Sequence, residues 1–333
     1  MVARVLKITL PLLVIALLVL GGYHYWQHEQ RYPNTDDAYI QAYVINIAPR
    51  IEGKVNGVFV HNHEHIKKGQ LLFTIDPELY QIAVNKAQAD LDNTQQMIDA
   101  NEMAVESAQA VVTQRQAELA DTQEQTKRTL LLVKDNYMSH ADGDLATKNL
   151  RVAKATLQAA KSQLSKAIQQ RGVMGSNNAQ LRAAQATLAQ AKLNLQYAKV
   201  TAPASGYIAN FDLRVGAVVP AYQSLFALIE DQSWWAEANF KETKLDNLKP
   251  GQRAIIKVDM YPGKKFTGIV SSIADGSGSS FSLLPPENAS GNWVKVTQRF
   301  PVKVLITSPQ QNYPLRLGAS CEVTIDTQSK VQQ

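Results

Sequence analysis

The region from Glu78 to Ala202 contains no proline, and it limits more than any other feature how this 333-residue chain can fold. Alanine, glutamine, leucine, lysine and acidic residues dominate it. Only two aromatic residues, Tyr137 and Tyr197, occur between positions 85 and 199. This composition is typical of long helices and not of a globular core, because it offers strong helix formers and few bulky side chains.

Apolar residues recur every seven positions along the first half of this region. The positions three residues further on are mostly small or polar, as at Ala87, Thr94 and Asn101. Such a narrow heptad seam fits one slender partner helix. The seam is apolar except at its one threonine and consists of Val84, Leu91, Ile98, Val105, Val112, Leu119, Thr126 and Val133.

The second half supplies that partner, with leucines in sevens and alanines three residues after them. The stretch RGVMGSNN interrupts the pattern, and the step across it (181 − 164 = 17 residues) is two heptads plus three, which shifts the seam. Gly172 and Gly175 should weaken or kink the helix there. The leucines are Leu150, Leu157, Leu164, Leu181, Leu188 and Leu195.

Two arms of similar length, residues 78–134 and 143–199, flank a polar turn at about residues 135–143. Each arm would be roughly 85 Å long as a helix, at 1.5 Å per residue. We therefore predict one antiparallel coiled-coil hairpin over residues 78–199. The alternative, two separate helices of a bundle, would need a wider apolar face than either arm has.

The segments that flank the hairpin repeat each other at an offset of 153 residues without a gap. Each copy reads as short strands separated by turn residues. We predict two halves of one β-sandwich, residues 46–77 and 200–231, which bring the arms side by side. The matched pairs are Gly53/Gly206, Val55/Ile208, Val60/Leu213, Ile66/Val219, Leu72/Leu225, Phe73/Phe226 and Ile75/Leu228.

The N-terminal sequence predicts a membrane anchor. Residues 8–26 carry no formal charge and are long enough to cross a bilayer core of about 30 Å. Arg4 and Lys7 precede this span, so residues 1–7 should lie in the cytoplasm and everything after the span outside it. A cleaved signal peptide is the alternative, but no small-residue cleavage site follows the apolar run. Residues 27–45 then form a membrane-proximal segment.

After residue 231 the chain reads as strands with Gly and Pro loops up to residue 327, followed by a short tail at 328–333. Trp234 and Trp235 open one of these strands, and alternation should place one ring inside and the other outside. The single cysteine, Cys321, allows no internal disulfide, and we interpret it as a small residue packed in a strand.

Half of the six histidines lie in HNHEH at residues 61–65. In an extended strand His61, His63 and His65 would share a face and could bind zinc or copper. The repeat, however, places His63 in a turn and needs no histidine in its other half. We interpret the stretch as a polar turn, with a metal-binding envelope sensor as the alternative.

This arrangement resembles the EmrA-like membrane fusion proteins of the HlyD periplasmic adaptor family. The motifs TDDAYIQAYVINIAPRIEGKV at residues 35–55 and ANFKET at 238–243 carry the likeness, with the loop-and-strand segment 278–304. The resemblance implies an elongated multidomain fold of mixed α and β: an N-terminal transmembrane helix, a split lipoyl-like sandwich, the hairpin and a C-terminal β-barrel at 232–327.

The resemblance also implies a function: a single-pass protein of the bacterial inner membrane with its bulk in the periplasm. It would bridge a proton-driven major-facilitator drug transporter and a TolC-like outer-membrane channel, as a trimer or hexamer, and export small toxic compounds. An ABC-type secretion or aromatic-acid export adaptor is the alternative within the family, and a structural envelope spacer is another.

The predicted turn carries a pattern that resembles the channel-docking tip of this family. In RTLLLVKDNYMS, Leu132 follows Arg128 by four residues and Ser139 follows Leu132 by seven. Arg128 could donate to carbonyls or carboxylates, Leu132 could fill an apolar notch, and Ser139 could cap a helix. The acidic HADGD that follows departs from the family and could tune the choice of channel.

The sequence offers no enzymatic constellation, such as a phosphate-binding glycine loop, G-x-S-x-G or H-E-x-x-H. The acidic pairs at 36–37 and 230–231 read as solvated turns. A lipoyl lysine would lie in the turn that the hairpin replaces, so we expect neither lipoate nor biotin. The excess of Lys and Arg, 34 against 29 acidic residues, is scattered, which disfavours nucleic-acid binding.

Overall fold

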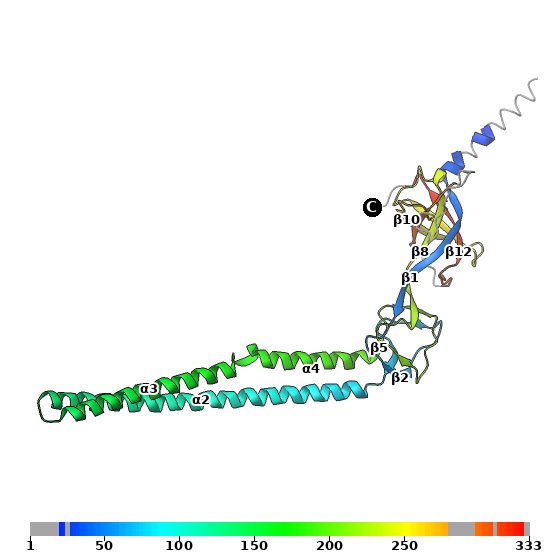
Figure 1. Cartoon of the computed structure of the whole chain (residues 1–333). Coiled ribbons are helices and arrows are strands. Elements are labelled where there is room, and N and C mark those ends of the chain that lie inside the picture. Colours follow the sequence, from blue (N-terminus) through cyan, green and yellow to red (C-terminus); the bar gives the residue numbers. More distant parts are fainter. Residues whose placement is uncertain (1–19, 24–26, 279–296, 309–311, 330–333) are drawn as a thin grey trace, which may run out of the picture.

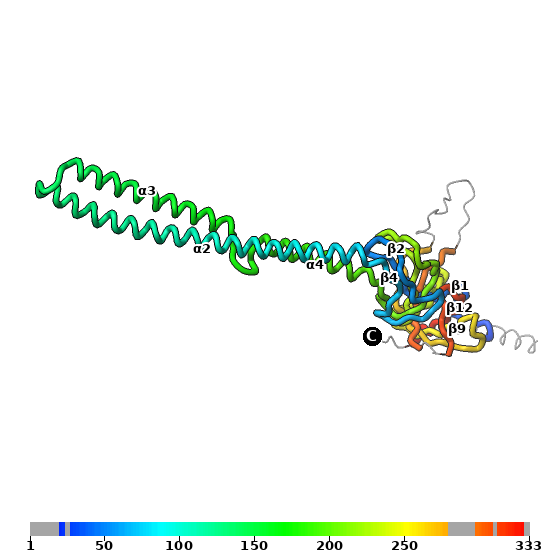
Figure 2. The backbone as a smooth tube through the Cα atoms, turned by 90° about the horizontal axis from the view of Figure 1, so that it is seen from below, coloured from blue at the N-terminus to red at the C-terminus, as the bar shows by residue number. Residues whose placement is uncertain are grey.

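The computed structural model describes residues 20–23, 27–278, 297–308 and 312–329. A β-barrel lies next to the helical segment at residues 27–31, a smaller β-sandwich follows, and a long helical hairpin projects from the sandwich (Figure 1). Figure 2 shows the same arm from below. The predicted cytoplasmic segment and nearly all of the predicted anchor lie outside the described residues. Among the helices that are described, none is long and apolar enough to cross a bilayer.

The first arm of the hairpin is one helix, α2 (Glu78–Lys134), with the bounds predicted from the sequence. It packs against α3 (His140–Arg171) and α4 (Ala179–Tyr197), which together make the returning arm. Every residue of the heptad seam in α2 is buried or half-buried, while the neighbours on the other faces are mostly exposed. The seven-residue pattern therefore identifies the contact face correctly.

The returning arm is broken where the glycines predicted a kink. Gly172 and Gly175 have φ angles of 73° and 70°, which favour glycine, and a short 3-10 turn (η1, Gly175–Asn177) connects the two helices. Asn178 is buried and caps α4, accepting from the backbone N–H of Gln180 and donating to the carbonyl of Val173. The break between α3 and α4 is therefore an ordered turn that the hydrogen bonds of Asn178 stabilise.

The sandwich is assembled from both halves of the sequence repeat. Gly53 pairs with Val219, and the equivalent Gly206 pairs with Ile66, so each half adds a strand to the other. The matched residues are buried except Gly53 and Leu225, which are half-buried. The strands are β2 (Gly53–Val58), β3 (His65–Ile66), β4 (Leu71–Ile75), β5 (Lys199–Thr201), β6 (Gly206–Ala209) and β7 (Val218–Val219).

The barrel is closed by a strand that the sequence analysis did not assign. β1 (Asn34–Ile47) lies in the segment expected only to be membrane-proximal, yet it pairs with both β12 and β8. β1 and β8 also run on into the sandwich and connect the two domains (Figure 1). The other barrel strands are β8 (Phe226–Lys241), β9 (Arg253–Val258), β10 (Phe266–Ile273), β11 (Arg299–Ile306) and β12 (Ser320–Asp326).

Two smaller expectations concern the paired tryptophans and the two acidic pairs of the barrel strands. Trp234 is buried and Trp235 is half-buried under the ammonium of Lys303, as alternation predicted. The prediction that the acidic pairs lie in turns is wrong, because both occur within strands. Asp37 in β1 pairs with Arg299 at 3.2 Å, and Asp231 belongs to β8. Arg299 compensates the charge of Asp37, and the ring of His65 contacts Asp231; local sequence shows neither of these partners.

Two tyrosines attach the hairpin to the sandwich. The hydroxyl of Tyr80, in the first turn of α2, donates to the carbonyl of Glu52 at 2.7 Å. The guanidinium of Arg50 donates to the hydroxyl of Tyr197 at 2.8 Å and lies 4.8 Å from its ring centroid. Burial, and then the Glu52 carboxylate, raise the pKa of Tyr80 above its usual value. Both arms are therefore held by the same loop, residues 49–52.

Candidate functional site

The tip of the hairpin is a compact, hydrogen-bonded turn. α2 ends as Asn136 adopts a φ of 61°, and the N–H of Tyr137 donates to the carbonyl of Leu132 at 2.8 Å. This is the left-handed end that asparagine tolerates after a helix. Gly143 then lies buried against Val133 and Leu130, so the two arms approach closely immediately behind the turn.

The three residues predicted to dock a channel all lie at this tip. Arg128 and Leu132 are four residues apart on α2 and share a face. Arg128 is exposed and forms no ion pair within the described part of the chain, and Leu132 is 43% exposed. The tip carries further exposed apolar side chains: Leu130, Leu131, Tyr137, Met138 and Leu145. Apolar surface beside an unpaired cation is typical of a protein contact.

Ser139 has a structural role that the sequence analysis named only as one option. Its hydroxyl accepts from the N–H of Asp142, and the Asp142 carboxylate accepts from the N–H of Ser139 at 3.2 Å, which makes a capping box. The spacing S-x-x-D could have revealed this box, so Asp142 is a residue that the sequence reasoning missed.

Replacing Ser139 by alanine should destabilise the first turn of α3 by about 1 kcal/mol, because the Asp142 N–H loses its acceptor. Hydrogen exchange of the Asp142 and Gly143 amides, which donate to Ser139, should accelerate roughly fivefold. Ser162→Ala, an exposed site inside the same helix, is the matched control and should leave these amides unchanged. Equal exchange in Ser139→Ala and wild type would show that the cap does not hold the turn.

The three clustered histidines do not converge. His61 is exposed and its backbone N–H donates to Glu64, whereas the ring of His65 contacts Asp231, at the sandwich end of the domain junction, at 2.6 Å. His63 has a φ of 64° and lines a groove of about 370 Å³ between the sandwich and the loop 314–317. No group of three metal-binding side chains occurs among the described residues. Their arrangement therefore does not support the sensor alternative.

The turn at His63 has an equivalent in the second half of the sequence repeat. Its equivalent, Gly216, has a φ of 92°, so both halves need a left-handed residue at the same place. We expect His63→Gly to raise the free energy of unfolding by about 1 kcal/mol, because glycine adopts this conformation without steric cost. Gly216→Ala should lower it by a similar amount. Thermal unfolding of the full chain measures both, and a destabilised His63→Gly would mean that the imidazole contributes contacts.

Cys321 is buried in β12, in line with the packed residue expected from the sequence. Burial, and then the carboxylate of Asp259, raise the pKa of its thiol to about 12. The unfolded thiol ionises near pH 8.5, so its contribution to stability is complete below that pH and declines as pH rises toward 12. Between pH 9 and 11 wild type should therefore lose stability faster than Cys321→Ala; parallel pH curves from urea unfolding would contradict this.

Comparison with known proteins identifies the family to which the chain belongs. Residues 43–231 match the barrel-sandwich hybrid domain of RND membrane fusion proteins, and residues 233–326 match the AAEA-like β-barrel domain. The chain belongs to the membrane fusion protein family. The two matches meet at residues 231–233, within β8, where the sandwich passes into the barrel.

Characterised relatives match this membrane fusion protein along almost its whole length. Multidrug resistance protein MdtN of Escherichia coli K12 is 34% identical over 330 residues, 95% of this chain and 96% of MdtN. Multidrug export protein EmrA of Haemophilus influenzae is 31% identical, covering 95% of this chain and 83% of EmrA. The solved membrane fusion protein Spr0693 of Streptococcus pneumoniae shares the fold, with a TM-score of 0.53 at 15% identity over 90% of this chain and 99% of Spr0693.

Proposed function

We propose that this membrane fusion protein is the periplasmic adaptor of a multidrug efflux system. The observation that carries the proposal is the hairpin, whose exposed apolar tip lies at the far end from the barrel and the N-terminal helical segment (Figure 1). Residues 8–26 would anchor the barrel end to the inner membrane, and the tip would reach an outer-membrane channel of the TolC type. The full-length similarity to MdtN and EmrA supports drug export as the process served.

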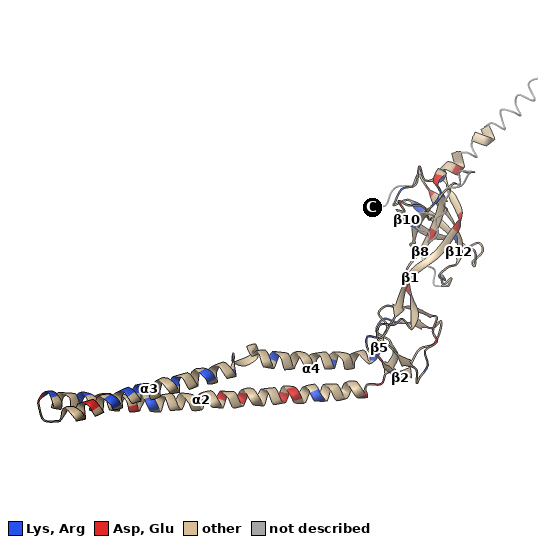
Figure 3. Cartoon of the chain, in the orientation of Figure 1, with Lys and Arg blue, Asp and Glu red and all other residues tan. Residues whose placement is uncertain are grey.

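The partner in the inner membrane would be a proton-driven major-facilitator transporter, and the chain itself would perform no catalysis. Both basic and acidic residues are distributed along the hairpin (Figure 3). The narrow seam of α2 leaves little apolar area to stabilise an isolated coiled coil. Neighbouring copies in a trimeric or hexameric ring, and the channel, would add the missing contacts.

Site-specific cross-linking in the intact cell envelope tests the docking half of the proposal. A photoreactive amino acid at Tyr137, which is 80% exposed at the tip, should capture an outer-membrane channel protein. The same amino acid at Tyr222, equally exposed on the sandwich, is the matched control and should not capture the channel. Capture of inner-membrane proteins alone from Tyr137 would refute the proposed orientation.

Co-purification tests the transporter half. A tagged full chain should retain a transporter of 12 to 14 predicted spans, as expected for a major-facilitator partner. Retention of an ATP-binding protein instead would assign the chain to an ABC-type system.

A further inference from the structure

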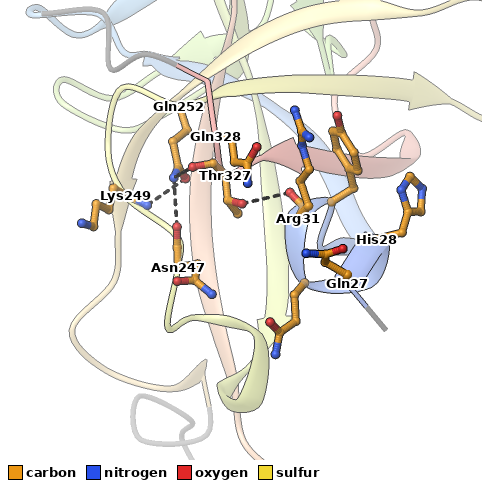
Figure 4. A pocket seen from close by; sticks show the side chains of 10 residues that line it. Gln27, His28, Arg31, Asn247, Lys249, Gln252, Thr327 and Gln328 are labelled. Carbon is orange, nitrogen blue, oxygen red and sulfur yellow. Dashed lines mark hydrogen bonds between the residues drawn. The ribbon is translucent and has the colours of Figure 1, made fainter. Parts of the chain in front are cut away.

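A polar pocket of about 610 Å³ lies at the barrel end next to the N-terminal helical segment. Asn247, Lys249 and Gln252 form one wall and Gln27, His28 and Arg31 the facing one, as Figure 4 shows. Residues Gln30, Tyr32, Thr327 and Gln328 complete the lining. The pocket therefore begins at the first residue after the predicted membrane span.

The floor of this pocket is preformed. Gln252 is only 3% exposed, and its side-chain N–H groups donate to the carbonyls of Asn247 and Thr327 at 2.9 and 3.1 Å. Its side-chain oxygen accepts from the N–H of Lys249 at 2.9 Å. The hydroxyl of Thr327 donates to the carbonyl of Arg31 at 3.0 Å and so ties the helical segment to the barrel. A ligand would meet a surface already held in place, which lowers the entropic cost of binding.

Most of the polar groups that line the pocket above this floor have no partner among the described side chains. Four carboxamides make no side-chain hydrogen bond within the described parts of the chain: those of Gln27, Gln30, Asn247 and Gln328. Two cations, Arg31 and Lys249, form no ion pair within the same residues, and the Arg31 guanidinium lies 5.2 Å from the ring centroid of Tyr32. Among the described residues no carboxylate lines the pocket, and Glu29 of the same helical segment pairs with Lys244 at 3.2 Å.

The cations and carboxamides that line the pocket indicate which kind of ligand it can bind. Arginine and lysine bind phosphate oxygens, and a pocket without carboxylates does not repel an anion. Carboxamides both donate and accept, which suits the hydroxyl and ester oxygens of a polyol. An anionic phosphodiester that carries hydroxyl groups satisfies both sets, whereas a purely apolar or cationic ligand satisfies neither.

We infer that the pocket binds the glycerophosphate headgroup of an anionic membrane lipid. The inference rests on the proposed anchor, which would hold Gln27 at the headgroup layer, a zone of several ångströms beyond the hydrocarbon core. A headgroup bound between the helical segment and the barrel would fix the barrel's orientation on the membrane surface. Cations at such a surface each strengthen binding to anionic lipid by several-fold.

Binding of short-chain phosphatidylglycerol and phosphatidylcholine to the full chain in detergent, measured by native mass spectrometry, tests the inference. Wild type should prefer phosphatidylglycerol, and the double variant Arg31→Gln/Lys249→Gln should lose about tenfold in affinity for it. The matched control is Lys265→Gln/Arg316→Gln, two exposed cations at the opposite end of the barrel. It removes the same charge and should bind like wild type.

Equal affinity of wild type for both lipids, or an equal loss in the control variant, would overturn the headgroup site. A third measurement titrates the full chain with free glycerol 3-phosphate. Binding as tight as that of the lipid would show that the ligand is a soluble phosphate ester and overturn the lipid assignment. Carbonate extraction of native membranes tests the anchor separately, so failure of the anchor and failure of the pocket give different results.

Discussion

Cells that carry Arg128→Asp or Leu132→Asp in this chain should be as drug-sensitive as cells that lack the chain. At the proposed contact, aspartate in place of Arg128 reverses a charge that has no compensating partner among the described residues. Aspartate in place of Leu132 puts a carboxylate into an apolar surface, and an unpaired charge buried at an interface typically costs several kcal/mol. Either loss is large enough to abolish the assembly, and the minimal inhibitory concentration of an exported drug measures it.

The control for this prediction is Lys86→Asp, which reverses an exposed cation on the same helix near the base of the hairpin. This variant should keep full resistance, because its site is far from the tip. All three variants should reach the same level in membranes, since the altered side chains are exposed and outside the seam of α2. Unchanged resistance in Arg128→Asp and Leu132→Asp at normal levels would remove the tip from the docking surface.

The parts of the fold that the sequence predicted are those governed by periodicity. The heptad seam of α2 needs only a count in sevens, and its arm therefore ends at Lys134 as expected. The repeat at 153 residues predicted that Phe73 and Phe226 are equivalent, and their rings meet in the core with centroids 6.1 Å apart. A periodic pattern is visible in the sequence because each repeat places an apolar residue at an equivalent packed position.

The parts that were missed depend on partners distant in the chain. β1 closes the barrel through pairing with β8, about 200 residues later, and nothing in its local pattern distinguishes a barrel strand from a membrane-proximal segment. Asp231 and His65 are 166 residues apart, so their contact likewise has no local signature. At the candidate tip the positions of Arg128 and Leu132 were predictable, whereas the closure around Gly143 required the register between the arms.

Gly206→Ala should destabilise the junction between sandwich and barrel more than other single-methyl additions to the described glycines. A Cβ at this position would lie 2.0 Å from the carbonyl oxygen of Ile229 and 3.1 Å from the Cα of Glu230, both in the backbone of β8. Backbone cannot rotate away as a side chain can, so β6 and β8 must separate. Overpacking of this kind costs about 3 kcal/mol.

The position of Gly206 makes this loss spread to both domains. It pairs with Ile66 of β3 on one side and with Glu230 of β8 on the other, and β8 continues from there into the barrel. Amides of β3 and β6 should therefore exchange more than a hundredfold faster in Gly206→Ala, with a smaller increase in the barrel. Gly278→Ala, whose Cβ would meet no atom of the described residues within 4 Å, is the matched control and should exchange like wild type. If the two variants exchange alike, the close approach of β6 to β8 does not stabilise the junction, and the continuous strands β1 and β8 hold the domains together without it.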